Sequence, residues 1–227
     1  MPISAILPLI GAIFLFLLGF FVLYKNRSSI TNLTFFCLSL CLTIWLFGTS
    51  MMFLSKTDER AIFWDRFIYA GVVFIPTFLY HFSLAFAGKI KEQKKLLFLG
   101  YIFSFVFLIL SRTNYFVSDL FRYQWGVHTK AQFFHHIFLG VFFIYVLLFF
   151  FNIYKCYRTT TAAIKRSQAK YVFLSIFVLT IGSLAFLPAY GIGIHPFVFL
   201  AEIGGAIILA YAIVKYRLMD IRVVIGR

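Results

Sequence analysis

Seven long apolar runs, separated by short loops that carry charge, constrain this sequence more than any other feature. Most of the runs have the roughly 17 to 25 residues that an α-helix needs to cross the hydrocarbon core of a bilayer. They cover residues 4–24, 31–54, 67–87, 96–111, 133–154, 171–190 and 195–214. The fourth run is short, but Lys94, Lys95 and Arg112 at its ends extend its reach, because long basic side chains snorkel to the interface. The sequence therefore predicts an all-α membrane protein, a bundle of seven transmembrane helices.

The composition agrees with a membrane protein. Of the 227 residues, 63% are hydrophobic and 12% are charged, whereas soluble domains are nearer half apolar and a quarter charged. A net charge of +14 would suggest nucleic acid for a soluble chain. Here the basic residues lie in short loops, where they orient the helices and contact lipid headgroups. We therefore predict the lipid bilayer as a partner and no binding to nucleic acid.

The basic residues divide unequally between the two sides of the predicted bundle. Fifteen of the 21 Lys and Arg fall in the odd-numbered loops and the C-terminal tail, and six fall in the other loops. Because cytoplasmic loops are enriched in Lys and Arg, we predict that the N-terminus lies outside and the C-terminus in the cytoplasm. Residues 1–227 are predicted to form a single domain, in which 215–227 is a cytoplasmic tail.

One residue of the last run, Glu202, is out of place in hydrocarbon. A carboxylate within a span is costly unless it is protonated, paired or facing water, and such residues are commonly functional. Glu202 shares its helix face with Gly205 and Ala206, whose small size lets another helix approach, so it is predicted to face the bundle interior. Arg66 is the best-placed cation at that depth. Two interpretations stay open: Glu202, with or without Arg66, lines a ligand pocket open to the outer side, or both residues form a structural tie between helices.

The third run carries several polar side chains. At 100° per residue, four of them fall on one stripe, which should contact protein or water and not lipid. Pro76 is expected to bend this helix midway. With Glu202 added, the hypothetical ligand-binding residues are Arg66, Tyr69, Thr77, Tyr80 and Glu202.

Other features carry weaker signals. Four of the five histidines lie on or near the outer side, but no carboxylate or cysteine at ligand spacing accompanies them, so interfacial packing is favoured over metal binding. The aromatic-rich segment 112–132 is expected at the membrane interface, with a lid over a cavity as the alternative. The sequence contains no nucleotide-binding or protease motif, and the last run holds no lysine for retinal. We predict no catalysis, no cofactor and no metal.

Three features of the sequence occur together: the order of the seven runs with the N-terminus outside, Phe74-Ile75-Pro76 leading to Phe82 and Phe86-Ala87-Gly88, and the terminal string from Tyr211 to Ile221. In these features the chain resembles the N-terminal seven-helix sensor region of bacterial histidine kinases. The resemblance covers essentially the whole chain. It implies a receptor of two-component signalling in the bacterial cytoplasmic membrane, followed by a cytoplasmic output domain that is most often a kinase. The chain ends at Arg227 without a phosphoacceptor helix or an ATP-binding domain, so we expect kinase activity to lie in an output domain or partner.

The expected mechanism places the stimulus, an outer-side ligand or a membrane property, among the third, fifth and seventh helices. The seventh helix would then tilt or rotate, and since no Gly or Pro interrupts the helix from Gly205 through Ile221, the motion would pass stiffly into the tail. The predicted output residues are Lys215, Arg217, Asp220 and Arg222. The identity of the ligand and a homodimer are left open. A small transporter or channel component is the competing interpretation, disfavoured by the odd number of runs and the scarcity of prolines within them.

Overall fold

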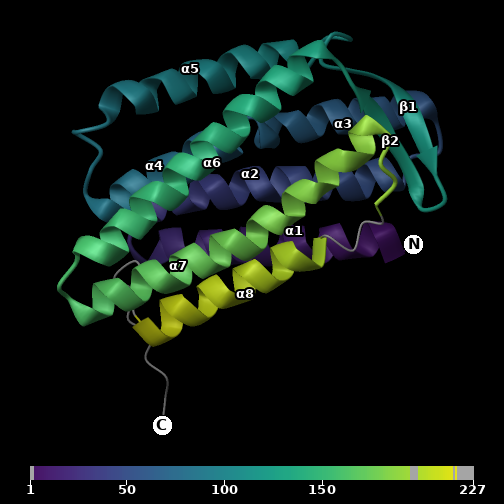
Figure 1. The fold of residues 1–227 in the computed structure, drawn as a ribbon. Coiled ribbons are helices and arrows are strands. Elements are labelled where there is room, and N and C mark those ends of the chain that lie inside the picture. The colour runs from purple at the N-terminus through teal and green to yellow at the C-terminus, as the bar shows by residue number, and fades with distance from the viewer. Residues whose placement is uncertain (1–2, 195–198, 217, 219–227) are drawn as a thin grey trace.

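Long helices and one small sheet make up the structure, a computed structural model that describes residues 3–194, 199–216 and 218. The helices are α1 (Ile3–Lys25), α2 (Ile30–Phe53), α3 (Asp58–Val72), α4 (Ile75–Ala87), α5 (Lys94–Leu110), α6 (Phe133–Thr159), α7 (Ala163–Ile181) and α8 (Phe199–Tyr216). A 3-10 helix, η1 (Gly182–Tyr190), continues α7, and strands β1 (Val117–Tyr123) and β2 (Gly126–Ala131) form a hairpin. In Figure 1 the helices lie side by side, the hairpin closes the end at which α1 begins, and α8 ends at the opposite end.

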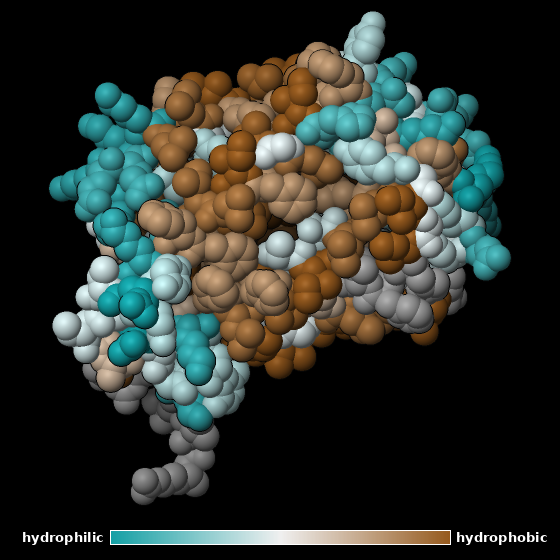
Figure 2. Space-filling view, viewed as in Figure 1, coloured by the Kyte–Doolittle hydropathy of each residue, from teal (hydrophilic) through white to brown (hydrophobic). Residues whose placement is uncertain are grey.

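Among the described residues, five helical stretches are long and apolar enough to cross a membrane by length and composition: Ile3–Lys25, Ile30–Phe53, Asp58–Ala87, Phe133–Thr159 and Ala163–Tyr190. The two remaining predicted runs correspond to α5 and α8, and residues 195–198 of the last run lie outside the described residues. Figure 2 shows a hydrophobic surface across the middle of the molecule, with hydrophilic side chains gathered at both ends. The predicted class, a helical membrane protein, is therefore confirmed.

The third predicted run is helical but divided in two. The first part, α3, ends at Val72, and Pro76 lies in the first turn of α4. Proline lacks an N–H and its ring collides with the carbonyl of the preceding turn, so it ends a helix or begins a new one. The helix is thus interrupted just before Pro76, close to the position of the predicted bend. The helix also starts earlier than the apolar run, at Asp58, because Thr57 caps its N-terminus.

The segment 112–132, a connection expected at the membrane interface with a lid as the alternative, contains the β-hairpin. Its strands pair antiparallel from Val117 with Ala131 to Tyr123 with Gly126. Phe116 and Val117 at its base are fully buried, whereas Tyr115 is 72% exposed. Only part of this segment therefore matches the expected interfacial position, and the hairpin forms a cover on one end of the bundle.

Small residues bring α7 and α8 into close contact. A Cβ added at Gly205 would lie 2.5 Å from Cγ of Leu179 and 2.8 Å from the carbonyl oxygen of Ser175. The Ser175 hydroxyl donates a hydrogen bond to the Gly205 carbonyl at 2.8 Å, and Ala206 is fully buried. The predicted inward direction of this face of the last helix is confirmed.

Candidate functional site

Two adjoining cavities inside the bundle form the candidate site. The first, of about 30 Å³, lies beneath the hairpin among α2, α3, η1 and α8, and we call it the hairpin cavity. The second, of about 40 Å³, lies among α2, α4, α6, α7, η1 and α8, and we call it the Glu202 cavity. Trp45 and Phe186 line both cavities, and their rings stack with centroids 6.1 Å apart. This aromatic pair is a wall common to the two spaces.

Glu202 brings a carboxyl group into an otherwise mostly apolar space. Its side chain belongs to the first turn of α8 and is 1% exposed, and neither carboxyl oxygen has a hydrogen-bond partner among the described residues. The hydroxyls of Thr180 and Ser183 line the same cavity but donate to backbone carbonyls, at 2.7 Å and 2.6 Å. A buried carboxyl without a hydrogen-bond donor is costly. We therefore expect the Glu202 carboxyl to be protonated or to accept a hydrogen bond from a water molecule or a ligand.

Gly182 provides the space that the Glu202 carboxyl occupies. A Cβ at position 182 would lie 1.7 Å from Oε1 and 2.7 Å from Cδ of Glu202. No side chain is compatible with such a contact unless the glutamate moves. Because Gly182 joins α7 to η1, the carboxyl touches the point at which the α-helix changes to a 3-10 helix.

Arg66, the expected partner of Glu202, lies elsewhere. Its guanidinium donates to the side-chain oxygen of Asn114, and its carbonyl accepts a hydrogen bond from Arg112 at 2.9 Å. In the part of the chain that the structure describes, no ion pair joins Arg66 to Glu202. The long side chain of Arg66 extends to the loop that follows α5, where polar partners are present. Of the two interpretations left open, the structural tie between Arg66 and Glu202 is therefore contradicted.

The other three residues of the predicted stripe point to different neighbours. The Tyr69 hydroxyl pairs with Nε2 of His135 at 2.8 Å. Thr77 donates to a backbone carbonyl of α5 at 3.0 Å, and Tyr80 donates to Gln93. Tyr69 belongs to α3, whereas Thr77 and Tyr80 belong to α4, so the stripe counted along one continuous helix is divided between two elements. Of the three, only Tyr69 lines one of the two cavities.

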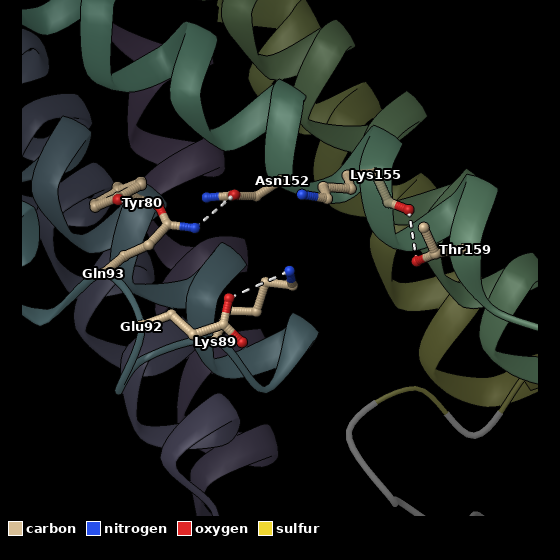
Figure 3. Close-up of polar contacts among 7 residues, drawn as sticks. All are labelled: Tyr80, Lys89, Glu92, Gln93, Asn152, Lys155 and Thr159. Atoms are coloured by element: carbon tan, nitrogen blue, oxygen red, sulfur yellow. Dashed lines mark hydrogen bonds and ion pairs between the residues drawn. The ribbon is translucent and has the colours of Figure 1, made fainter.

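Tyr80 belongs to a polar network at the end of the bundle opposite the hairpin, drawn in Figure 3. Gln93 accepts from Tyr80 and donates to Oδ1 of Asn152 at 3.2 Å. Asn152 in turn donates to the hydroxyl of Ser83 at 3.1 Å. The network joins α4, the loop before α5 and α6, and none of its members lines either cavity. These hydrogen bonds hold the helices together and do not form part of the candidate site.

The hairpin cavity contains a second buried carboxyl, Asp65, which the sequence reasoning missed. Asp65 is 1% exposed, and the hydroxyl of Thr129 on β2 donates to its Oδ2 at 2.6 Å. His128 lines the same cavity, and its Nδ1 donates to the carbonyl of Thr129 at 3.1 Å. The hairpin thus holds α3 through a buried side-chain hydrogen bond.

His135 is packed inside the bundle and not at its surface. It is fully buried, and its two ring nitrogens pair with the hydroxyls of Tyr69 and Tyr190, at 2.8 Å and 2.7 Å. This row of side chains joins α3, α6 and η1. Among the described residues, no group of three His, Cys, Asp or Glu side chains is arranged to hold a metal ion.

Comparison with known proteins gives one family. The family described as the N-terminal 7TM region of histidine kinase matches residues 7–222. That range includes both cavities and the whole of α2 to α8. Neither the curated proteins nor the solved structures contain a match to this chain.

Proposed function

This chain belongs to the family of N-terminal 7TM regions of histidine kinases, and from that premise we propose that its last helix passes a stimulus from the hairpin end of the bundle to a cytoplasmic output domain such as a kinase. The chain is a membrane sensor region. In the proposal its helices cross the bacterial cytoplasmic membrane seven times, α3 with α4 and α7 with η1 each counting as one span. The hairpin then faces outside and the C-terminus the cytoplasm. The unequal distribution of Lys and Arg supports this orientation.

The contact between Glu202 and Gly182 carries the proposal. It joins the first turn of α8 to the junction of α7 and η1. Phe186 of η1 is shared by the two cavities. A ligand or a change of membrane thickness that displaces η1 therefore alters the contact on Glu202 and tilts α8. Since packed elements shift between discrete arrangements, a small displacement here has a defined consequence for the helix.

The far end of α8 also follows α7 closely. The ring of Tyr216 stacks on Tyr171 with centroids 4.9 Å apart, and Gln168 donates to the Tyr216 carbonyl at 3.0 Å. The ammonium of Lys215 donates to the hydroxyl of Tyr211, and this hydrogen bond raises the pKa of Lys215. Movement of α8 along or around α7 would disturb these contacts, which support a role for Lys215 in output.

The predicted output residues beyond this point are Arg217, Asp220 and Arg222, and they lie outside the described residues, as does the predicted continuation of the helix to 221. They remain part of the proposal. Of the residues predicted to bind a ligand, we retain Glu202 and Tyr69, because each lines a cavity.

A flexible insertion in a full-length receptor that carries this region tests the proposal. Two glycines placed after Val214 interrupt the helix between membrane and output domain, whereas two glycines after Asn26 lie in the loop between α1 and α2. Autophosphorylation in membrane vesicles should lose its dependence on the stimulus in the first variant and keep it in the second. Stimulus-dependent activity that survives the insertion after Val214 would refute transmission through the last helix.

A further inference from the structure

Aromatic rings form much of the wall of the hairpin cavity. Phe53 and Trp125 pack edge to face with ring centroids 5.6 Å apart, and Phe53 and Trp45 each contact Phe199, at 6.4 Å and 6.2 Å. The six aromatic residues that line the cavity are Trp45, Phe53, Tyr69, Trp125, Phe186 and Phe199. They come from α2, α3, the hairpin turn, η1 and α8, so segments far apart in the sequence build one aromatic enclosure.

A buried carboxyl faces the same enclosure. Asp65 lines the cavity and accepts one hydrogen bond among the described residues, from Thr129 at 2.6 Å. Two other residues could donate to it: Arg66, which follows it in the sequence, and His128, which lines the same cavity. The guanidinium of Arg66 is directed to Asn114, and Nδ1 of His128 donates to a backbone carbonyl. Neither donates a hydrogen bond to Asp65, so the carboxyl retains capacity to accept another donor.

The chemistry of this wall favours a cation that can also donate hydrogen bonds. The faces of aromatic rings carry negative potential and attract ammonium groups, and a carboxylate attracts them more strongly. An anion would be repelled by Asp65, and a purely apolar guest would leave the carboxyl buried without a new donor. A hydrogen-bonding ammonium group satisfies both parts of the wall.

The size of the cavity sets the size of the group. A cavity needs a volume of about 10 to 15 Å³ to hold one water-sized group, and the volume of the hairpin cavity is about 30 Å³. It therefore accommodates about two non-hydrogen atoms. Methylammonium has that size, and tetramethylammonium, with five such atoms and no N–H donor, does not fit.

We propose that the hairpin cavity binds the protonated headgroup of a small primary amine, with Asp65 as the acceptor and the aromatic rings around the methylene carbon. The inference deepens the proposed function by naming a ligand class, and it rests on that function only for what binding achieves. The same headgroup occurs on free alkylamines and on ethanolamine lipids. Trp125 lines the cavity and stacks on Tyr123, which donates a hydrogen bond to the carbonyl of Pro188 in η1 at 2.6 Å. A displacement of Trp125 on amine binding would therefore reach η1 through these contacts.

Tryptophan fluorescence of the purified protein in phosphatidylcholine nanodiscs tests the proposal. Two of the three tryptophans, Trp45 and Trp125, line the cavity. Methylammonium chloride should give a saturable change beyond that of sodium chloride at equal ionic strength, and tetramethylammonium should be at least tenfold weaker. Asp65→Asn should abolish the change, and Asp58→Asn, at an exposed carboxyl paired with Arg122, should keep it.

Ala185→Leu provides a second variant that fills the cavity and leaves Asp65 in place. It should also abolish the change, and gel filtration with circular dichroism identifies variants that fail to fold. A response equal to that of sodium chloride, or one retained in a folded Asp65→Asn or Ala185→Leu protein, overturns the proposal. If Asp65→Asn does not fold, the comparison of the two amines and the Ala185→Leu variant decide.

Nanodiscs that contain phosphatidylethanolamine distinguish the two sources of the headgroup. A methylammonium titration that shifts to higher concentration in these discs than in pure phosphatidylcholine assigns the lipid headgroup as the ligand, because the lipid then competes for the site, and an unchanged titration assigns a free amine. Both results support the amine site. Binding without a change in kinase output would refute transmission but not the site, whereas normal transmission without amine binding would refute the site alone.

Discussion

The carboxyl of Glu202 lies directly against the backbone of Gly182, so that a Cβ at position 182 would fall 1.7 Å from Oε1. One residue belongs to the first turn of α8 and the other to the junction of α7 with η1. No described residue offers the carboxyl a hydrogen bond. This turn of α8 therefore packs against the start of η1, and in the proposed mechanism η1 is the element through which a stimulus reaches the last helix.

Replacing Gly205 should loosen the α7–α8 pair. In Gly205→Ala the new Cβ would meet Leu179 and the Ser175 carbonyl at less than 3 Å, and overpacking of this kind costs about 1–3 kcal/mol of unfolding free energy. Gly140→Ala in α6 is the matched control, because a Cβ there meets nothing within 4 Å. It should leave the protein unchanged or more stable by up to about 1 kcal/mol. Thermal unfolding in detergent, followed by circular dichroism, measures both, and equal midpoints for the two variants would contradict the packing.

The row Tyr69–His135–Tyr190 should contribute to stability through both hydroxyls. Tyr69→Phe and Tyr190→Phe each leave one ring nitrogen of a fully buried histidine without its partner, at a cost of about 1–3 kcal/mol. Tyr115→Phe, at a side chain that is 72% exposed, should have no measurable effect. Denaturation in detergent checks the three variants, and a wild-type midpoint for Tyr69→Phe would show that this hydrogen bond is dispensable.

The proposed orientation predicts opposite results for two reporter fusions. A fluorescent protein fused after Arg227 should fold and fluoresce, and alkaline phosphatase at the same position should be inactive, because phosphatase requires the oxidising outer compartment to form its disulfides. Phosphatase inserted at Gln124, in the hairpin turn, should be active. An active phosphatase after Arg227 would contradict the proposed orientation and place the C-terminus outside.

The apolar runs predicted the helices well but placed their ends poorly. Each of the runs proved helical where its residues are described, because a stretch of about twenty apolar residues has few other stable states in a bilayer. The start of α3 was missed because Asp58 and Glu59 are polar and lie before the apolar run, although Thr57 is a common capping residue. The hairpin was missed because the short strands of segment 117–131 lie between much stronger helical signals.

The site was only partly predictable for a different reason. The small residues Gly205 and Ala206 correctly predicted that Glu202 faces the bundle interior, since they lie at a close contact between helices. Similar depth along two helices did not bring Arg66 to Glu202, because depth says nothing about the direction in which each side chain points. Asp65 had a usable signal: it precedes Tyr69, a residue of the stripe predicted to contact protein or water, by four positions, which places both residues on the same face of the helix.

Transmission by contact between Glu202 and Gly182 is tested most directly by kinase output from a full-length receptor that carries Gly182→Ala. The new methyl group should displace the Glu202 side chain and shift basal autophosphorylation several-fold, whereas Gly140→Ala should leave it unchanged. The double variant Gly182→Ala/Glu202→Ala removes the clash, so it should recover the thermal stability lost in Gly182→Ala while responding weakly to the stimulus. A Gly182→Ala receptor with wild-type basal and stimulated activity, or a double variant with a full response, would contradict transmission through this contact.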